Sequence, residues 1–246
     1  MMFNTNHHVL IIEPHGDDAF ISASSVLDDR TIQKTLVTLS CRDSKFLETI
    51  YDNLRVEYLD LHDIDVYLKS KIPTHVVHRM YLGGEDVFSY VDSRIKKDVE
   101  DVYEDTVKDI QDSLRPYLMN SEYDGFYIPL GLDHPYHMAT REAVLRELSS
   151  HEDSLRKVIF YCDKPYIAKR YVQEVMSTYL TRYFESYVMT KVQLSEYQIS
   201  KKTDNFLKAY PTEGGMLVWT RDSVLKDPDI FITGGVPRDS SSGIER

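Results

Sequence analysis

The chain has 246 residues, of which 42% are hydrophobic and 28% charged, and its formal net charge at pH 7 is −11. This length suits one α/β domain with a well-filled core, and we take residues 1–246 as one domain with a loose, serine-rich tail from about residue 239. The acidic balance disfavours a surface that neutralises nucleic-acid phosphates or binds an anionic membrane. No window approaches the ~20 apolar residues of a membrane span. We therefore expect neither a nucleic-acid partner nor a membrane span.

The two cysteines, Cys41 and Cys162, lie far apart and form neither a CxxC pair nor a disulfide framework. They predict reduced, buried thiols. The amino-terminal residues lack the pattern of a signal peptide, so we expect a cytoplasmic protein. Nothing in the sequence decides between a monomer and a homo-oligomer.

Short apolar runs alternate with segments of helical periodicity along the chain. Strands are expected at residues 9–12, 35–41, 74–81, 123–130, 157–162, 216–219 and 230–233. Helices are expected at residues 19–27, 46–61, 88–114 and 137–148 and over most of 168–210, with Pro116 ending or kinking the third. This alternation predicts an α/β fold with a mostly parallel sheet covered by helices on both faces. Ligands of such sheets gather beyond the carboxyl ends of the strands.

The first polar segment at such a strand end is Pro14-His15-Gly16-Asp17-Asp18. His15 and Asp18 are three residues apart on a strand-to-helix turn, so they can point the same way and bind one metal ion. Asp17 would then be free to act on the water of that metal. The alternative is that Asp17 or Asp18 merely caps the following helix.

The second polar segment is His134-Pro135-Tyr136-His137, which also follows a predicted strand and opens a helix. One of its imidazoles can complete the metal triad, while the other stands beside the open position. A catalytic Zn²⁺ takes three nitrogen or oxygen ligands and keeps one position open. A spare carboxylate and a spare imidazole would supply the proton transfers of metal-assisted hydrolysis, which the two segments together predict.

The two segments resemble the signature of the LmbE-like, or PIG-L-like, family of zinc-dependent N-deacetylases. That signature is a strand followed by His-Pro-Asp-Asp-Glu and a distal His-Pro-Asp-His. Residues 160–166 (FYCDKPY) resemble the aromatic, acid and Pro-Tyr segment of many members, and residues 208–212 give a weaker match. These matching pieces follow one another in the order of the family signature and together span most of the chain.

The resemblance implies a Rossmann-like fold and assigns roles by position. His15, Asp18 and His137 match the zinc ligands, Asp17 matches the general base, and His134 matches the imidazole that stabilises the oxyanion. The implied activity is removal of an N-acyl group, in the first place acetyl, from a small amino sugar or glycoconjugate. The sequence does not distinguish zinc from another divalent metal.

Three departures from the signature predict a divergent member. Gly16, Ala19 and Tyr136 replace its proline, glutamate and aspartate. Tyr136 is the most serious, because the missing acid would tune the adjacent imidazole; Asp133 is the nearest substitute in the sequence. Tyr136 and Ala19 keep open the alternative of a non-catalytic binding protein that retains the fold. A second alternative is a zinc amidase that cuts a larger amide conjugate with the same site residues.

Three further residues are candidates for contact with the substrate. Arg42 follows the second predicted strand and can grip an anionic or hydroxylated group, although such residues are often only solvated. Asp163 and Tyr166 belong to the segment at 160–166 and are expected to line the site. The alternative for this pair is a turn that packs an aromatic ring.

Overall fold

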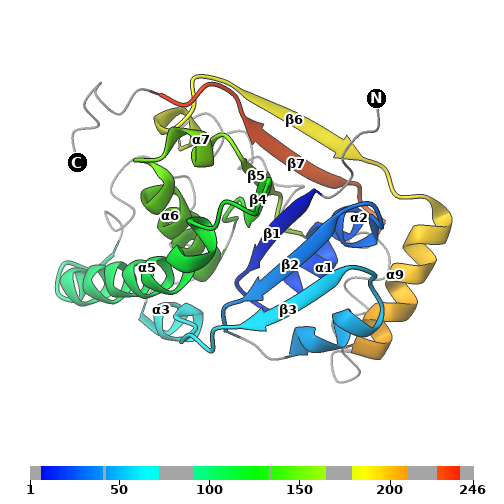
Figure 1. The fold of residues 1–246 in the computed structure, drawn as a ribbon. Coiled ribbons are helices and arrows are strands. Elements are labelled where there is room, and N and C mark those ends of the chain that lie inside the picture. The colour runs from blue at the N-terminus through cyan, green and yellow to red at the C-terminus, as the bar shows by residue number, and fades with distance from the viewer. Residues whose placement is uncertain are drawn as a thin grey trace.

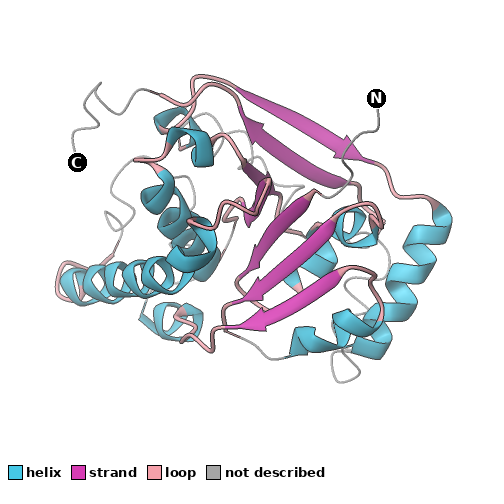
Figure 2. Ribbon diagram, in the orientation of Figure 1, coloured by secondary structure: helices cyan, strands magenta, loops and turns pink. Residues whose placement is uncertain are grey.

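A computed structural model describes residues 7–40, 43–71, 91–132, 134–164, 179–209 and 226–238. In these residues seven strands form one sheet in the order β3-β2-β1-β4-β5-β7-β6 (Figure 1, Figure 2). The strands are β1 (His8–Glu13), β2 (Gln33–Thr38), β3 (Leu54–Tyr58), β4 (Gly125–Pro129), β5 (Val158–Tyr161), β6 (Tyr187–Val192) and β7 (Asp229–Gly234). The five strands from β3 to β5 run parallel, and β7 runs antiparallel to both of its neighbours. The predicted mostly parallel sheet is confirmed.

The central strand β1 is apolar on both faces because both faces are covered. Val9 and Ile11 pack into one hydrophobic cluster, whereas Leu10 and Ile12 pack into another on the opposite face of the sheet. A strand buried on both sides reads as a continuous apolar run, which is why the sequence located β1, β4, β5 and β7 well.

Helices cover both faces of the sheet, as predicted. In Figure 1, α5 and α6 lie on one side, and α1, α2 and α9 lie on the other. The helices are α1 (Asp18–Ser22), α2 (Ser24–Asp28), α3 (Asp65–Lys71), α5 (Lys96–Leu118), α6 (Pro135–Leu148), α7 (Glu152–Leu155) and α9 (Glu196–Ala209), with 3-10 turns η1 (Asp43–Thr49) and η3 (Leu180–Arg182). Among the described helices, none combines the length and the apolar character that a membrane crossing requires.

Two expected helices differ from the structure. Residues 46–61 were expected to form one helix, but they hold the end of η1 and the parallel strand β3. The 3-10 turn η1 ends at Thr49, Asn53 adopts a positive φ of 57° in the turn that follows, and β3 then begins at Leu54 and pairs with β2. Residues 19–27 form two short helices, because the backbone at Ala23 (φ −130°, ψ 30°) leaves the helical region.

The prediction that Pro116 ends or kinks the long helix is wrong as to its end, since α5 continues to Leu118. Pro116 lies in the last turn of α5 on its exposed face, where water can reach the carbonyl of Asp112, which receives no N–H from the proline. The expectation of mostly helix over residues 168–210 is wrong in part, because β6 lies within this range. The expected strands at 74–81 and 216–219 and the tail from 239 lie outside the described residues.

Candidate metal centre

The turn after β1 is held by a buried glutamate. Glu13 is fully buried, and its carboxylate accepts hydrogen bonds from the Ala19 N–H (3.0 Å) and the Thr38 hydroxyl (2.6 Å). Glu13 therefore caps α1, and Asp17 at the N-cap position makes no capping hydrogen bond with its side chain. Asp18 instead accepts a hydrogen bond from the His15 N–H at 2.8 Å. These contacts do not support the alternative in which Asp17 merely caps the helix.

The second segment enters the site from the start of α6. His134 is the N-cap residue in an extended conformation, and its side chain makes no capping hydrogen bond. Pro135 at the first helical position carries no N–H that would need an acceptor. His137 in the first turn is 2% exposed, and the His134 ring stacks on it with centroids 4.9 Å apart. The His134 ring also lies 5.9 Å from that of His15.

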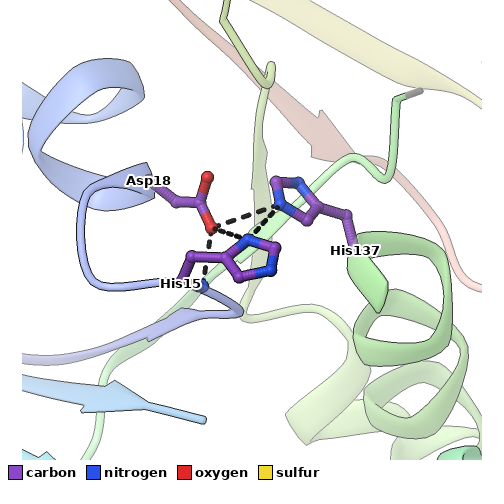
Figure 3. A group of neighbouring side chains, drawn as sticks. All are labelled: His15, Asp18 and His137. Atoms are coloured by element: carbon purple, nitrogen blue, oxygen red, sulfur yellow. Dashed lines mark hydrogen bonds and ion pairs between the residues drawn. The ribbon is translucent and has the colours of Figure 1, made fainter. Parts of the chain in front are cut away.

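His15, Asp18 and His137 converge on one point, as Figure 3 shows. His15 Nδ1 lies 3.1 Å from His137 Nε2 and 3.4 Å from Asp18 Oδ2, and His137 Nε2 lies 3.2 Å from the same oxygen. Tetrahedral zinc with ligands at about 2.0–2.1 Å would place them about 3.3–3.4 Å from one another. Among the described residues, these three are the one group of His, Cys, Asp and Glu side chains with ligand atoms so placed.

The outer nitrogens of both imidazoles face carboxylates. His137 Nδ1 lies 2.8 Å from Asp163 Oδ1, and His15 Nε2 lies 3.1 Å from Asp63 Oδ2. A ring N–H that donates to a carboxylate leaves the other ring nitrogen with a lone pair. The other two ring nitrogens, His15 Nδ1 and His137 Nε2, then each carry a lone pair beside the Asp18 carboxylate. This donor set suits a divalent cation such as zinc.

Asp163 is itself fixed by the loop after β4. Its second oxygen accepts hydrogen bonds from the N–H groups of Gly131 (2.8 Å) and Leu132 (2.9 Å), and Asp163 is 2% exposed. Gly131 has a positive φ of 78°, and a Cβ there would approach the backbone of Met138 to 3.1 Å. A glycine is therefore needed where this loop passes α6.

The electrostatics of the cluster favour a bound cation. Burial lowers the pKa of His15, but Asp18 and Asp63 outweigh it and raise that pKa to about 11. Burial likewise lowers the pKa of His137, and Asp18 and Asp163 raise it to about 10. Burial raises the pKa of Asp18, yet the two imidazoles hold it well below its usual range. Without a metal, protons supply the positive charge that the carboxylates require, so a metal ion has to compete with them.

The structure places only some of the other residues that were predicted to belong to the site. Arg42, Tyr166 and Asp133 lie outside the described residues. Asp163 contacts His137 and two backbone N–H groups, a positioning role that the sequence did not indicate; its contact with a substrate stays a prediction. Tyr136 is fully buried in the core, with its ring 5.7 Å from that of His15.

Two carboxylates at the site were missed. Glu13 lies directly after the strand expected at residues 9–12, and Asp63 lies just beyond the helix expected at residues 46–61. A buried acid at the end of an apolar strand was the one available signal for Glu13. Asp63 had none, because its loop reaches His15 only through the pairing of β3 with β2.

An open groove of about 750 Å³ lies at the other edge of the sheet, where β1, β2 and β3 begin. Its lining includes His8, Gln33 and Leu54 but none of the three candidate ligands. It is separate from the candidate metal centre.

Comparison with known proteins supports the fold. No protein-family model and no curated protein sequence matches the chain. Among solved structures, the zinc-inhibited form of teicoplanin deacetylase Orf2 is similar, with a TM-score of 0.58, 15% identity and coverage of 95% of this chain and 99% of that one. A deacetylase–teicoplanin complex from teicoplanin biosynthesis is also similar, with a TM-score of 0.56, 15% identity and coverage of 94% and 99%. The chain thus shares the α/β fold of these two deacetylase structures.

Proposed function

We propose that this protein is a divalent-metal hydrolase, in the first place a zinc enzyme, that removes an N-acetyl group from an amino sugar or glycoconjugate. The convergence of His15 Nδ1, Asp18 Oδ2 and His137 Nε2 within 3.4 Å of one another carries the proposal. The fold shared with two deacetylase structures supports the reaction class. When bound, such a metal acidifies a water molecule and polarises a carbonyl oxygen.

In this proposal Asp17 is the general base. It shares the turn of His15 and Asp18, is half-buried, and is not used as a cap of α1. Its carboxylate accepts a proton from the attacking water and later gives it to the departing amine. The amide carbon becomes tetrahedral during the attack, and the C–N bond breaks as the amine gains its proton.

His134 donates a hydrogen bond to the carbonyl oxygen as negative charge develops there. Its half-buried ring stacks on the ring of His137, and its side chain makes no capping hydrogen bond to α6. A donor in this position is worth about 10²–10³ in turnover. His15, Asp18 and His137 hold the metal, and Asp163 orients His137.

The test combines metal analysis with a release assay. Purified protein is loaded with zinc from below one equivalent to excess, because one structural neighbour is described in a zinc-inhibited form. Acetate release is measured over N-acetylhexosamine derivatives, and cleavage of larger amide conjugates is measured in parallel. We expect one zinc per chain and release of acetate; conjugate cleavage alone would identify the amidase alternative.

Two variants separate binding from chemistry. His137→Ala should lose the metal, whereas Asp17→Asn should keep it and lose turnover. If Asp17→Asn retains both the metal and wild-type turnover, the assigned base is wrong. Stoichiometric zinc without turnover on any N-acyl substrate would favour the non-catalytic binding protein.

A further inference from the structure

The loop between β3 and α3 carries a carboxylate to the outer face of His15. Asp63 Oδ2 lies 3.1 Å from His15 Nε2, on the side of the ring opposite Asp18 and His137. Neither polar segment of the sequence contains this residue, which lies 48 positions after His15. The contact therefore exists only through the fold.

Hydrogen bonds to the end of β2 fix the path of this loop. The Leu59 N–H donates to the Thr38 carbonyl at 3.1 Å, and the Leu61 N–H donates to the Leu39 carbonyl at 2.7 Å. Asp60 between them adopts a positive φ of 56°, which turns the chain. Beyond Asp63, Ile64 is 2% exposed, and its carbonyl accepts the Leu68 N–H of α3. The backbone on both sides of Asp63 is thus anchored.

The contact between Asp63 and His15 resembles the contact between Asp163 and His137, but Asp63 is more exposed than Asp163. Asp163 faces the outer nitrogen of His137, and Asp63 faces the outer nitrogen of His15. The Asp163 side chain is 2% exposed, but that of Asp63 is 31% exposed. Asp63 can therefore be replaced with little disturbance of the core.

We propose that Asp63 is a positioning residue that accepts the Nε2–H of His15 and thereby presents His15 Nδ1 to the metal. This inference rests on the proposed metal site. A carboxylate in that position fixes the ring orientation and the tautomer and raises the basicity of the ligand. It makes no bond to the metal itself, so its removal weakens metal binding without abolishing it.

The experiment measures zinc affinity by competition with a chromophoric chelator, without any activity assay. We expect Asp63→Ala to weaken zinc binding by about 10- to 100-fold and to speed zinc release to the chelator. Asp63→Asn should lie between Asp63→Ala and wild type, because its amide oxygen can still accept from Nε2–H. Asp109→Asn, which removes the same charge from an exposed position on α5, should bind zinc as wild type does.

A second readout is the visible spectrum of the protein loaded with cobalt, which reports ligand geometry. It should change in Asp63→Ala and not in Asp109→Asn, and circular dichroism confirms that each variant is folded. Wild-type zinc affinity together with a wild-type cobalt spectrum in Asp63→Ala would overturn the inference and leave the proposed function standing. Loss of zinc as complete as in His137→Ala would also overturn it, because Asp63 would then be a ligand. Wild-type protein that binds no zinc would instead refute the proposed function.

Discussion

Replacing Asp163 by asparagine exchanges one carboxylate oxygen for an amide NH₂ group at the outer face of His137. One oxygen of Asp163 accepts the N–H groups of Gly131 and Leu132, so the amide oxygen of asparagine has to remain there. The NH₂ group then points at His137 Nδ1, which lies 2.8 Å from the other Asp163 oxygen. His137 must accept at Nδ1 and carry its proton on Nε2, the atom that faces the metal position.

The magnitude follows from these contacts. Loss of the carboxylate behind a metal-binding imidazole costs about 10- to 100-fold in metal affinity, or about 1.4–2.8 kcal/mol. The fold loses less in Asp163→Asn, because both backbone N–H groups keep an acceptor. In Asp163→Ala those two buried N–H groups lose their acceptor, at about 1–3 kcal/mol each. We therefore expect Asp163→Ala to be less stable than Asp163→Asn by about 2–6 kcal/mol.

Two assays distinguish these effects. Chelator competition gives the zinc affinity, and urea unfolding of the metal-free proteins gives the free energy of unfolding. Asp109→Asn serves as the charge-matched control. Wild-type zinc affinity in Asp163→Asn would contradict the role of the carboxylate behind His137. Equal free energies of unfolding for alanine and asparagine at this position would contradict its role as acceptor for the two backbone N–H groups.

Three further predictions concern neighbouring parts of the molecule. His134→Ala should retain zinc while turnover falls by about 10²–10³-fold, and a lost metal in elemental analysis would contradict this assignment. Glu13→Ala should lower the free energy of unfolding, measured with urea, by about 2–6 kcal/mol, because the Ala19 N–H and the Thr38 hydroxyl lose their buried acceptor. A change below about 0.5 kcal/mol would contradict this role of Glu13. Burial, together with Lys164, lowers the pKa of Lys202 from 10.5 to about 7 in the folded protein. Above pH 7 the unfolded chain therefore binds more protons than the folded one, and the free energy of unfolding rises with pH. This group should add about 2 kcal/mol to the free energy of unfolding between about pH 7 and pH 9, and Lys202→Met should show a rise smaller by that amount; equal rises would refute the assignment.

The sequence predicted best those elements whose environment is uniform along their length. Strands β1, β4, β5 and β7 are buried, and their apolar runs located them. Strand β6 is at the end of the sheet order with mostly exposed residues, so it has no such run. The helical spacing of Leu47, Ile50 and Leu54 misled the prediction for 46–61, because the pairing of β3 with β2 outweighed local periodicity.

For the site, the sequence predicted the residues that come from contiguous motifs. His15, Asp18 and His137 converge because two strand ends of a parallel sheet meet at one edge. The supporting carboxylates were harder to find. Asp63 depends on the path of a loop, and the role of Asp163 depends on the approach of the loop after β4 to the end of β5. Such contacts carry no spacing that a sequence pattern can show.

In the proposed metal centre, three side chains from two loops hold one metal ion. Anomalous X-ray scattering at the zinc edge, from crystals of protein loaded with one equivalent of zinc, tests it directly. We expect a single strong peak within bonding distance of His15 Nδ1, Asp18 Oδ2 and His137 Nε2. Zinc bound elsewhere on the chain, with no peak among these three atoms, would contradict the proposed metal centre.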